Sequence, residues 1–303
     1  MSNKLKGNAL LLITAFIWGT AFVAQKSGGE LGAFTFNGIR TFVGGLFLLP
    51  FIFVGYSRKK KISEKSVPIF TKGDLIAGTV CGVLLFIAAS LQQFGLAYTT
   101  AGKAAFITTL YVVFCPIFSI FLLKKGVKAI IWICVVLECI GLYLLCMQGD
   151  SFSIQFGDTL VLICAVAFSL QMIAVDYFIE KVDGLNLACL QFLISGAIGM
   201  VCMFIFERPI VPSEILSFWG PILYAGILSC GIGYTFQVLG QKYADPSIAA
   251  LILCLESVFG VLAGAVVLHE VMSLREIMGC AIMFVAVILS NLPEKKEKLS
   301  EAD

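Results

Sequence analysis

The two halves of this 303-residue chain repeat one another, and each half carries five apolar segments about as long as a lipid bilayer is thick. The stretch Gly7–Lys26 is similar to Gly157–Asp176, and Gly95–Leu145 is similar to Gly240–Ser290. Because five is an odd number, the second copy must enter the membrane from the opposite side. An inverted repeat of this kind is typical of secondary transporters, in which the substrate site lies near the bilayer midplane between the copies.

The composition also indicates a membrane protein. Hydrophobic residues make up 59% of the chain and charged residues 13%, against roughly 45–50% and 25% in soluble domains. In lipid each segment must satisfy its own backbone hydrogen bonds, which restricts spanning segments to helices and closed barrels. The short alternating strands of a membrane barrel are absent from the sequence. We therefore predict an all-α membrane protein.

The predicted architecture has ten transmembrane helices in a 5+5 inverted repeat. Residues 1–148 are expected to form the first five-helix repeat, 149–293 the second, and 294–303 a polar cytoplasmic tail. A cleaved signal peptide is the alternative for the first segment, but its apolar run is long and has a full-length counterpart in the second half. The expected spans are roughly 8–26, 34–54, 74–97, 102–123, 128–147, 157–178, 186–206, 217–240, 246–268 and 273–292.

Basic residues set the predicted orientation, because they gather on the cytoplasmic side of membranes. With the N-terminus in the cytoplasm, the outer side keeps only Lys26, Lys103, Arg208 and Arg275. Both termini of this cell-membrane protein are therefore predicted to lie in the cytoplasm. The run Arg58–Lys61 is interpreted as a topology anchor, with a patch that binds the phosphates of lipid or nucleic acid as the alternative. The net charge of +2 does not indicate nucleic-acid binding.

Enzymatic and metal-binding functions are disfavoured. The eleven cysteines form no CxxC pair, His269 is the only histidine, and neither an HExxH nor a GxSxG motif occurs. No metal and no cofactor is expected. A receptor or scaffold is also disfavoured, because almost every connection between spans is too short to form a docking surface.

Several motifs resemble one known family. They are Trp18-Gly19-Thr20-Ala21-Phe22-Val23, Arg40, Gly95–Ala105 running into Pro116, and its echo Tyr243–Ala250 running into His269-Glu270. Over nearly its whole length the chain resembles the EamA type of the drug/metabolite transporter superfamily. The family usually has a Gly-Glu pair before its fifth helix, where this chain has Lys124-Lys125. The resemblance implies the fold but no particular substrate.

Glu256 is the most informative polar residue within the predicted spans. It lies near the middle of the ninth span, and Tyr111 is its counterpart in the fourth. We predict that the two side chains face each other across one central cavity. A carboxylate there suits a cationic substrate group or a proton that couples transport, because a charge inside the bilayer is costly unless it has such a use. A protonated glutamate bonded to a neighbouring helix is the alternative.

Amide and aromatic side chains form a second candidate set at similar depth. Gln92 and Gln237 are repeat counterparts, and amides both donate and accept hydrogen bonds, which suits a neutral or zwitterionic ligand. The alternative is that these groups only bond helices to one another. With Glu256 and Tyr111, the predicted substrate-binding residues are Trp18, Thr20, Gln92, Gln93, Gln171, Tyr234 and Gln237.

Two further charges, Arg40 and Glu138, are interpreted as structural, because charges within a bilayer are commonly paired. The sequence gives no specific account of Glu138. The glycines Gly78, Gly82, Gly260 and Gly264 are expected to let helices approach closely.

Together these features predict a carrier of small organic metabolites that works by alternating access within the lipid bilayer. Export of amino acids or related metabolites is the leading interpretation, because the family resemblance includes such exporters. Uptake of a nucleoside- or vitamin-like compound is the alternative. Direction, coupling and homodimer formation are left open by the sequence.

Overall fold

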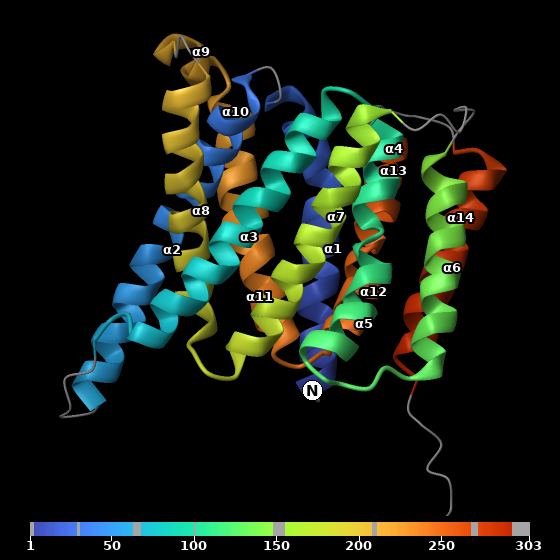
Figure 1. The fold of residues 1–303 in the computed structure, drawn as a ribbon, viewed down its shortest axis with the longest axis horizontal. Helices are drawn as coiled ribbons and strands as arrows, with labels where there is room; N and C mark the ends of the chain where they lie inside the picture. The colour runs from blue at the N-terminus through green and yellow to red at the C-terminus, as the bar shows by residue number, and fades with distance from the viewer. Residues whose placement is uncertain are drawn as a thin grey trace, which may run out of the picture.

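The computed structural model describes residues 3–28, 31–62, 68–99, 101–147, 155–207, 211–267 and 272–292. Across these ranges the regular structure is helical, with no strand, and the long helices run side by side in one bundle (Figure 1). The expected tail 294–303, the boundary at 148–149 and the side chains of Lys59–Lys61 lie outside the described residues.

The helices are α1 (Asn3–Gly28), α2 (Ala33–Ile62), α3 (Lys72–Leu96), α4 (Ala101–Thr109), α5 (Tyr111–Leu122), α6 (Ala129–Cys146), α7 (Phe156–Ile179), α8 (Gly184–Phe206), α9 (Pro212–Ser217), α10 (Trp219–Leu223), the π-helix η2 (Tyr224–Tyr234), α11 (Thr235–Gln241), α12 (Pro246–Leu253), α13 (Leu255–Val267) and α14 (Leu274–Ser290).

Eight helical segments of the described chain are long and apolar enough to cross a membrane, whereas the sequence predicts ten spans. The predicted spans 8–26 and 273–292 are helical, as α1 and α14, but are not among these eight. Three of the eight combine consecutive helices of the structure: Lys103–Leu122, Trp219–Gln241 and Pro246–Ala263.

Polar side chains fix where several helices begin. Thr71 precedes α3, its side chain accepts from the backbone N–H of Asp74, and the Asp74 carboxylate accepts from the Thr71 N–H at 2.8 Å. Ser273 and Glu276 make the same reciprocal pair at the start of α14. These capping boxes satisfy N–H groups that the first helical turn leaves without partners.

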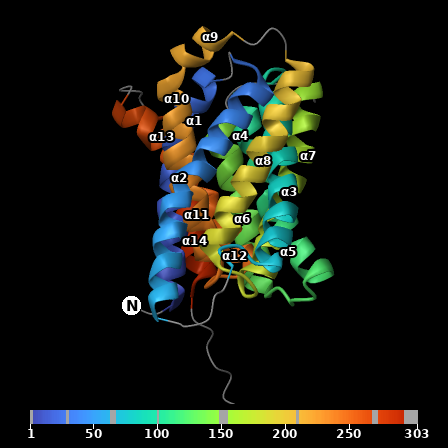
Figure 2. The ribbon, with the colours of Figure 1, turned by 90° about the vertical axis from the view of Figure 1, so that its left-hand side faces the viewer.

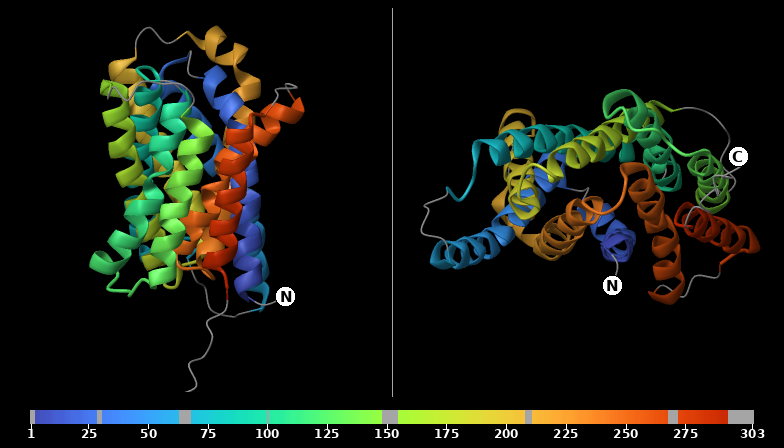
Figure 3. Two further views of the ribbon diagram at one scale, coloured as in Figure 1. Left: turned by 90° about the vertical axis from the view of Figure 1, so that its right-hand side faces the viewer. Right: turned by 90° about the horizontal axis from the view of Figure 1, so that it is seen from below.

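The helices of the two halves pack against one another reciprocally. The pairs α2 with α8 and α6 with α14 are in extensive contact, as the views in Figures 2 and 3 show. Helix α3 packs on α7, and η2 and α11 pack on α1. A Cβ atom on Gly95 would lie 2.4 Å from Val161 Cγ2, and one on Gly240 would lie 2.8 Å from Leu11 Cγ. Each glycine therefore allows the first helix of the other half to pack closely against it.

The predicted role of glycines in close packing is confirmed at two positions. A Cβ on Gly78 would meet Leu190 Cβ at 2.4 Å, and one on Gly82 would meet the Gln191 carbonyl oxygen at 2.8 Å, so α3 and α8 approach closely. Gly260 is less constrained, because a Cβ there would lie 3.4 Å from its nearest neighbour, the Gly19 carbonyl oxygen. The surroundings of Gly264 lie outside the described part of the chain.

Two spans predicted to be continuous are interrupted near their middle. The segment 102–123 breaks at Leu110 between α4 and α5, and the segment 246–268 breaks at Cys254 between α12 and α13. The breaks meet each other, because the Cys254 thiol donates to the carbonyl of Thr109 at 3.8 Å. Broken helices at membrane depth occur where the irregular backbone is buried or lines a cavity.

A third irregularity lies in the eighth predicted span, where η2 has a π-helical form over eleven residues. Two carbonyls of this segment accept side-chain hydrogen bonds from α1: Ser229 from Trp18 Nε1 at 3.3 Å and Gly233 from Thr14 Oγ1 at 2.9 Å. Because π-helices are rare and concentrate at functional sites, η2 draws attention to the space beside it.

A central polar cavity between the two halves

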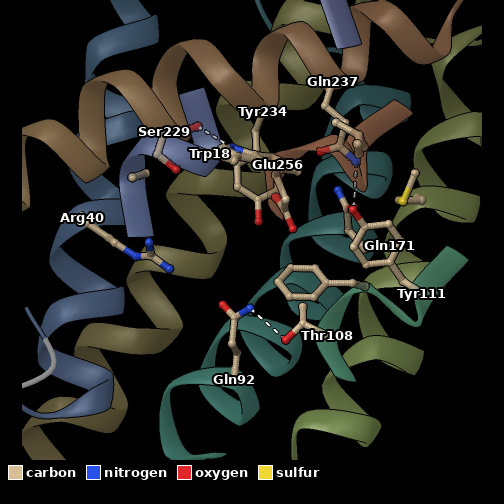
Figure 4. A pocket seen from close by; sticks show the side chains of 14 residues that line it. Trp18, Arg40, Gln92, Thr108, Tyr111, Gln171, Ser229, Tyr234, Gln237 and Glu256 are labelled. Atoms are coloured by element: carbon tan, nitrogen blue, oxygen red, sulfur yellow. Dashed lines mark hydrogen bonds between the residues drawn. The ribbon is translucent and has the colours of Figure 1, made fainter. Parts of the chain in front are cut away.

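The space beside η2 is a small cavity of about 60 Å³ at the centre of the bundle (Figure 4). Side chains from both halves of the chain enclose it. The lining residues are Trp18, Ala21, Arg40, Gln92, Thr108, Tyr111, Phe168, Gln171, Met172, Ser229, Tyr234, Gln237, Leu253 and Glu256.

Most of the lining consists of residues that are repeat counterparts of one another. Each repeat contributes one member of every such pair, so the cavity lies between the copies. The pairs are Trp18 with Phe168, Ala21 with Gln171, Gln92 with Gln237, Thr108 with Leu253, and Tyr111 with Glu256. The two members differ chemically in most pairs. The wall from one repeat therefore matches the wall from the other in the positions of its residues but not in their polarity.

The structure brings seven of the nine predicted substrate-binding residues to this cavity. Thr20 and Gln93 are the exceptions. The Thr20 hydroxyl contacts the carbonyls of Phe16 and Ile17 in its own helix and lies 2.9 Å from Tyr224 Oη, so its hydrogen bonds are satisfied elsewhere. Gln93 is buried without lining the cavity. The seven that line it are Trp18, Gln92, Tyr111, Gln171, Tyr234, Gln237 and Glu256.

Sequence reasoning missed several lining residues. Arg40, interpreted as structural, lines the cavity from α2, and Ser229 lines it from η2. Phe168 and Ala21 could have been found, because they are the repeat counterparts of the predicted Trp18 and Gln171. Nothing in the sequence distinguishes Met172 from other apolar residues.

Glu256 owes its place to the break at Cys254, which starts a new helix within the span. It lies in the first turn of α13, where unpaired backbone N–H groups favour a negative charge. Its side chain is only 7% exposed and points into the cavity (Figure 4). Within the described chain, no hydrogen bond or ion pair engages this carboxylate, which is therefore available to a ligand.

Tyr111 holds the equivalent position after the other break, as the first residue of α5. Its hydroxyl is buried and has no hydrogen-bond partner among the described residues. A buried hydroxyl of this kind costs free energy unless water or a ligand satisfies it. The two helix breaks thus place a phenol and a carboxylate on one cavity.

Four buried glutamines form a hydrogen-bonded chain along one wall. Gln171 Nε2 donates to Gln191 Oε1 at 3.1 Å, and Gln237 Nε2 lies 3.4 Å from Gln171 Oε1 and 3.1 Å from Gln241 Oε1. Gln241 Nε2 in turn donates to the Met172 carbonyl at 2.9 Å. The chain joins α7, α8 and α11, so both of the interpretations made from sequence hold here: the amides connect helices, and two of them line the cavity.

Replacing Gln171 with leucine should lower the free energy of unfolding by about 1 kcal/mol, because the change leaves Gln191 and Gln237 without their shared partner. The measurement is the thermal midpoint of the purified protein in detergent. Thr159→Leu, at an exposed position of the same helix, is the control and should shift the midpoint less. Equal shifts in both variants would contradict a structural role of the amide chain.

Positive charge and aromatic surface complete the cavity. Arg40 is buried, its guanidinium carbon lies 5.2 Å from the centre of the Phe36 ring, and the group points into the cavity (Figure 4). The rings of Trp18 and Tyr234 lie 4.4 Å apart between their centres. The cavity therefore offers a guanidinium, a carboxyl group, amides and aromatic faces. Among the described residues, no cluster of three or more His, Cys, Asp or Glu could hold a metal ion.

Glu138 does not belong to this site. It lies in α6, is fully buried, and neither carboxylate oxygen has a hydrogen-bond partner in the described part of the chain. No charged partner explains its burial, so its interpretation as a paired structural charge gains no support.

Ion pairs lie at both ends of the bundle. At the end where α1 begins, Lys125 Nζ lies 2.7 Å from Asp176 Oδ2, and at the opposite end Lys103 Nζ lies 3.9 Å from Asp158 Oδ2. Partial burial lowers the pKa of the Lys125 ammonium, but the hydrogen bond and charge of Asp176 outweigh this effect and raise that pKa above its ordinary value. On the alkaline side, the Lys125–Asp176 pair should therefore be lost only as the pH rises through this raised pKa.

Comparisons with known proteins agree with this architecture. The model of the EamA-like transporter family matches residues 5–147 and again 155–292. An uncharacterized transporter of Archaeoglobus fulgidus is 30% identical over 96% of this chain and 87% of its own length. An uncharacterized transporter of Clostridium kluyveri is 25% identical over 96% of this chain and 94% of its own length. A solved crystal structure, 18% identical, superposes with a TM-score of 0.76 over 94% of this chain and 96% of that one, which shows the likeness of the fold.

Proposed function

Because the chain belongs to the EamA-like transporter family, we propose that it is a ten-helix secondary carrier that exposes the central cavity alternately to the two sides of the cell membrane. In this proposal the ten helices form a 5+5 inverted repeat divided at residues 148–149, in which α1 and α14 join the eight apolar spans. Both termini lie in the cytoplasm in this arrangement, because the basic residues then gather inside.

The volume of the cavity is smaller than a metabolite requires. It measures about 60 Å³, whereas cavities that hold small organic ligands measure about 300–1,000 Å³. In the proposed cycle this conformation is a constricted state, and the halves separate on one side to admit substrate. The breaks at Leu110 and Cys254 and the π-helix η2 are the places where the spans can bend, since their backbone hydrogen bonding is already irregular.

The leading substrate class is an amino acid or a related zwitterion, moved outward. One observation carries this proposal: the guanidinium of Arg40 and the carboxyl group of Glu256 line the same cavity. An α-amino acid brings a carboxylate for the guanidinium and an ammonium for the carboxylate. A neutral ligand brings no charged partner for Glu256, and a buried carboxylate without such a partner is costly.

Transport assays in proteoliposomes test the proposal. Vesicles loaded with a mixed pool of amino acids, nucleosides and vitamins are followed by mass spectrometry, with empty vesicles as the background. We expect selective movement of amino acids. Selective movement of nucleosides or vitamins would instead support the uptake carrier that the sequence left as the alternative, and no movement by correctly inserted protein under an imposed proton gradient would contradict the carrier itself.

Arg40→Gln should reduce amino-acid transport about tenfold or more, because a charge-assisted hydrogen bond contributes about 1.5–3 kcal/mol. The matched control is Arg58→Gln, which removes the same charge from an exposed position of the same helix. The initial rate at low substrate concentration is the quantity to compare. Equal rates in the two variants would remove Arg40 from substrate recognition.

A further inference from the structure

A second cavity lies at the end of the bundle where α1 begins. With a volume of about 330 Å³, it is larger than the central one. It is enclosed by the start of α1, the α5–α6 connection, the start of α12 and the end of α14, all of which lie at the same end in Figure 1. Its polar lining includes Lys4, Asn8, Ser119, Lys125, Lys128, Tyr243, Asp245, Ser247 and Ser290.

The lining carries an excess of positive charge. Three lysines, Lys4, Lys125 and Lys128, face one carboxylate, Asp245. Lys4 Nζ donates to the Asn291 carbonyl at 3.0 Å, and Lys125 Nζ donates to Asp176 at 2.7 Å. Because an ammonium group has three donors, both lysines can hold these contacts and still donate to a ligand. The cavity thus has the charge and the donors to bind an anion.

Two helix N-termini add to the positive potential. Helix α6, of eighteen residues, begins after Lys128, and α12 begins after Asp245; neither start has a side-chain capping hydrogen bond. Unsatisfied N–H groups at a helix start attract negative charge and phosphate in particular. These starts reinforce the lysines, which carry the main part of the attraction.

Apolar surface adjoins the lysines. Val127, Ile130, Ile131, Ile248 and Leu292 also line the cavity, and the side chains of Ile130 and Leu292 are exposed. A site for a purely water-soluble anion does not need this surface. An amphiphile uses both parts, with its anionic group at the lysines and its hydrocarbon along the apolar rim.

We propose that this cavity binds a phosphate-bearing anion, held by Lys4, Lys125 and Lys128, and that its source is an anionic phospholipid of the cytoplasmic leaflet. The leaflet rests on the orientation proposed above, whereas the anion chemistry does not. Basic pockets between transmembrane helices on the cytoplasmic side are suited to lipid headgroups. A bound headgroup would sit directly beside the Lys125–Asp176 pair.

The test uses purified full-length protein in detergent, so that its outcome does not depend on transport. Phosphatidylglycerol, phosphatidylcholine and inorganic phosphate are added separately, and the thermal midpoint is measured for each. We expect phosphatidylglycerol to raise the midpoint by several degrees more than phosphatidylcholine. A shift with inorganic phosphate equal to that with phosphatidylglycerol would assign the site to free phosphate. Equal shifts with both lipids and none with phosphate would overturn the proposal.

Variants locate the effect. Lys4→Gln combined with Lys128→Gln should remove at least half of the phosphatidylglycerol-specific shift, while Lys4→Arg with Lys128→Arg should retain it. Lys72→Gln, which removes an exposed charge at the same end of the bundle, is the control and should also retain the shift. Native mass spectrometry of retained phosphatidylglycerol gives a second reading that does not need a folding midpoint. An unchanged shift and unchanged lipid retention in the Gln pair would contradict this location.

Discussion

Glu256→Gln should reduce transport about ten- to hundredfold while the protein stays folded. The substitution keeps the size of the side chain and removes its acidic group, so the cavity keeps its shape and loses the one carboxyl group among its described lining residues. A hydrogen bond to a charged group contributes about 1.5–3 kcal/mol, and about 1.4 kcal/mol corresponds to tenfold. The measurement is the initial transport rate in proteoliposomes containing matched amounts of correctly inserted protein.

Two other glutamates supply the controls for this prediction. Glu138→Gln alters a carboxyl group that is buried in α6 outside the cavity, and Glu214→Gln alters an exposed one on α9. Both variants should transport at nearly the unmodified rate. An equal loss in Glu138→Gln would indicate that burial of a carboxyl group, rather than its place in the cavity, causes the effect.

The same variant separates the two uses that a midplane carboxylate can have. If Glu256 carries a coupling proton, Glu256→Gln should lose accumulation driven by a pH gradient but retain exchange of substrate across the membrane. If Glu256 binds the substrate ammonium, both activities should fall together. Exchange and accumulation that both match the unmodified protein would exclude Glu256 from the mechanism.

Gly19→Val should produce the largest loss of stability among the changes considered, about 3 kcal/mol or more, because overpacking of a tight interface is costly. A Cβ at this position would lie 2.5 Å from the Glu256 carbonyl oxygen, 2.8 Å from Gly260 N and 2.8 Å from Phe259 Cβ. Backbone atoms cannot yield as a flexible side chain can. Helix α1 would therefore have to move away from α13, and the cavity wall between Trp18 and Glu256 would open.

The thermal midpoint in detergent and the yield of monodisperse protein are the measurements for Gly19→Val. Gly55→Val is the matched control, since a Cβ on Gly55 in α2 meets no atom within 4 Å. Both variants lower backbone freedom and add the same side chain, so their difference reports the contact between α1 and α13. Equal midpoints for the two variants would contradict the close approach at Gly19.

The sequence by itself determined the helical membrane class, the repeat and half of the cavity lining. A polar group in lipid must face a partner or a wet space, so polar residues at matching depths in repeated segments could be expected to meet. For this reason one cavity is lined by Trp18, Gln171 and Gln237. The pairing of Tyr111 with Glu256 followed from the repeat alone, since related positions approach one another when two copies pack reciprocally.

Only the tertiary structure decided where the helices break and which polar groups turn away from the cavity. The Thr20 hydroxyl is satisfied within α1 and by Tyr224, which depends on the rotation of α1 against its neighbours. Arg40 reaches the cavity because α2 packs along η2. No proline or glycine lies at the breaks at Leu110 and Cys254, so the sequence does not predict them. They are stable because each is packed against the other half, where the Cys254 thiol meets the Thr109 carbonyl, and such a contact exists only after the chain has folded.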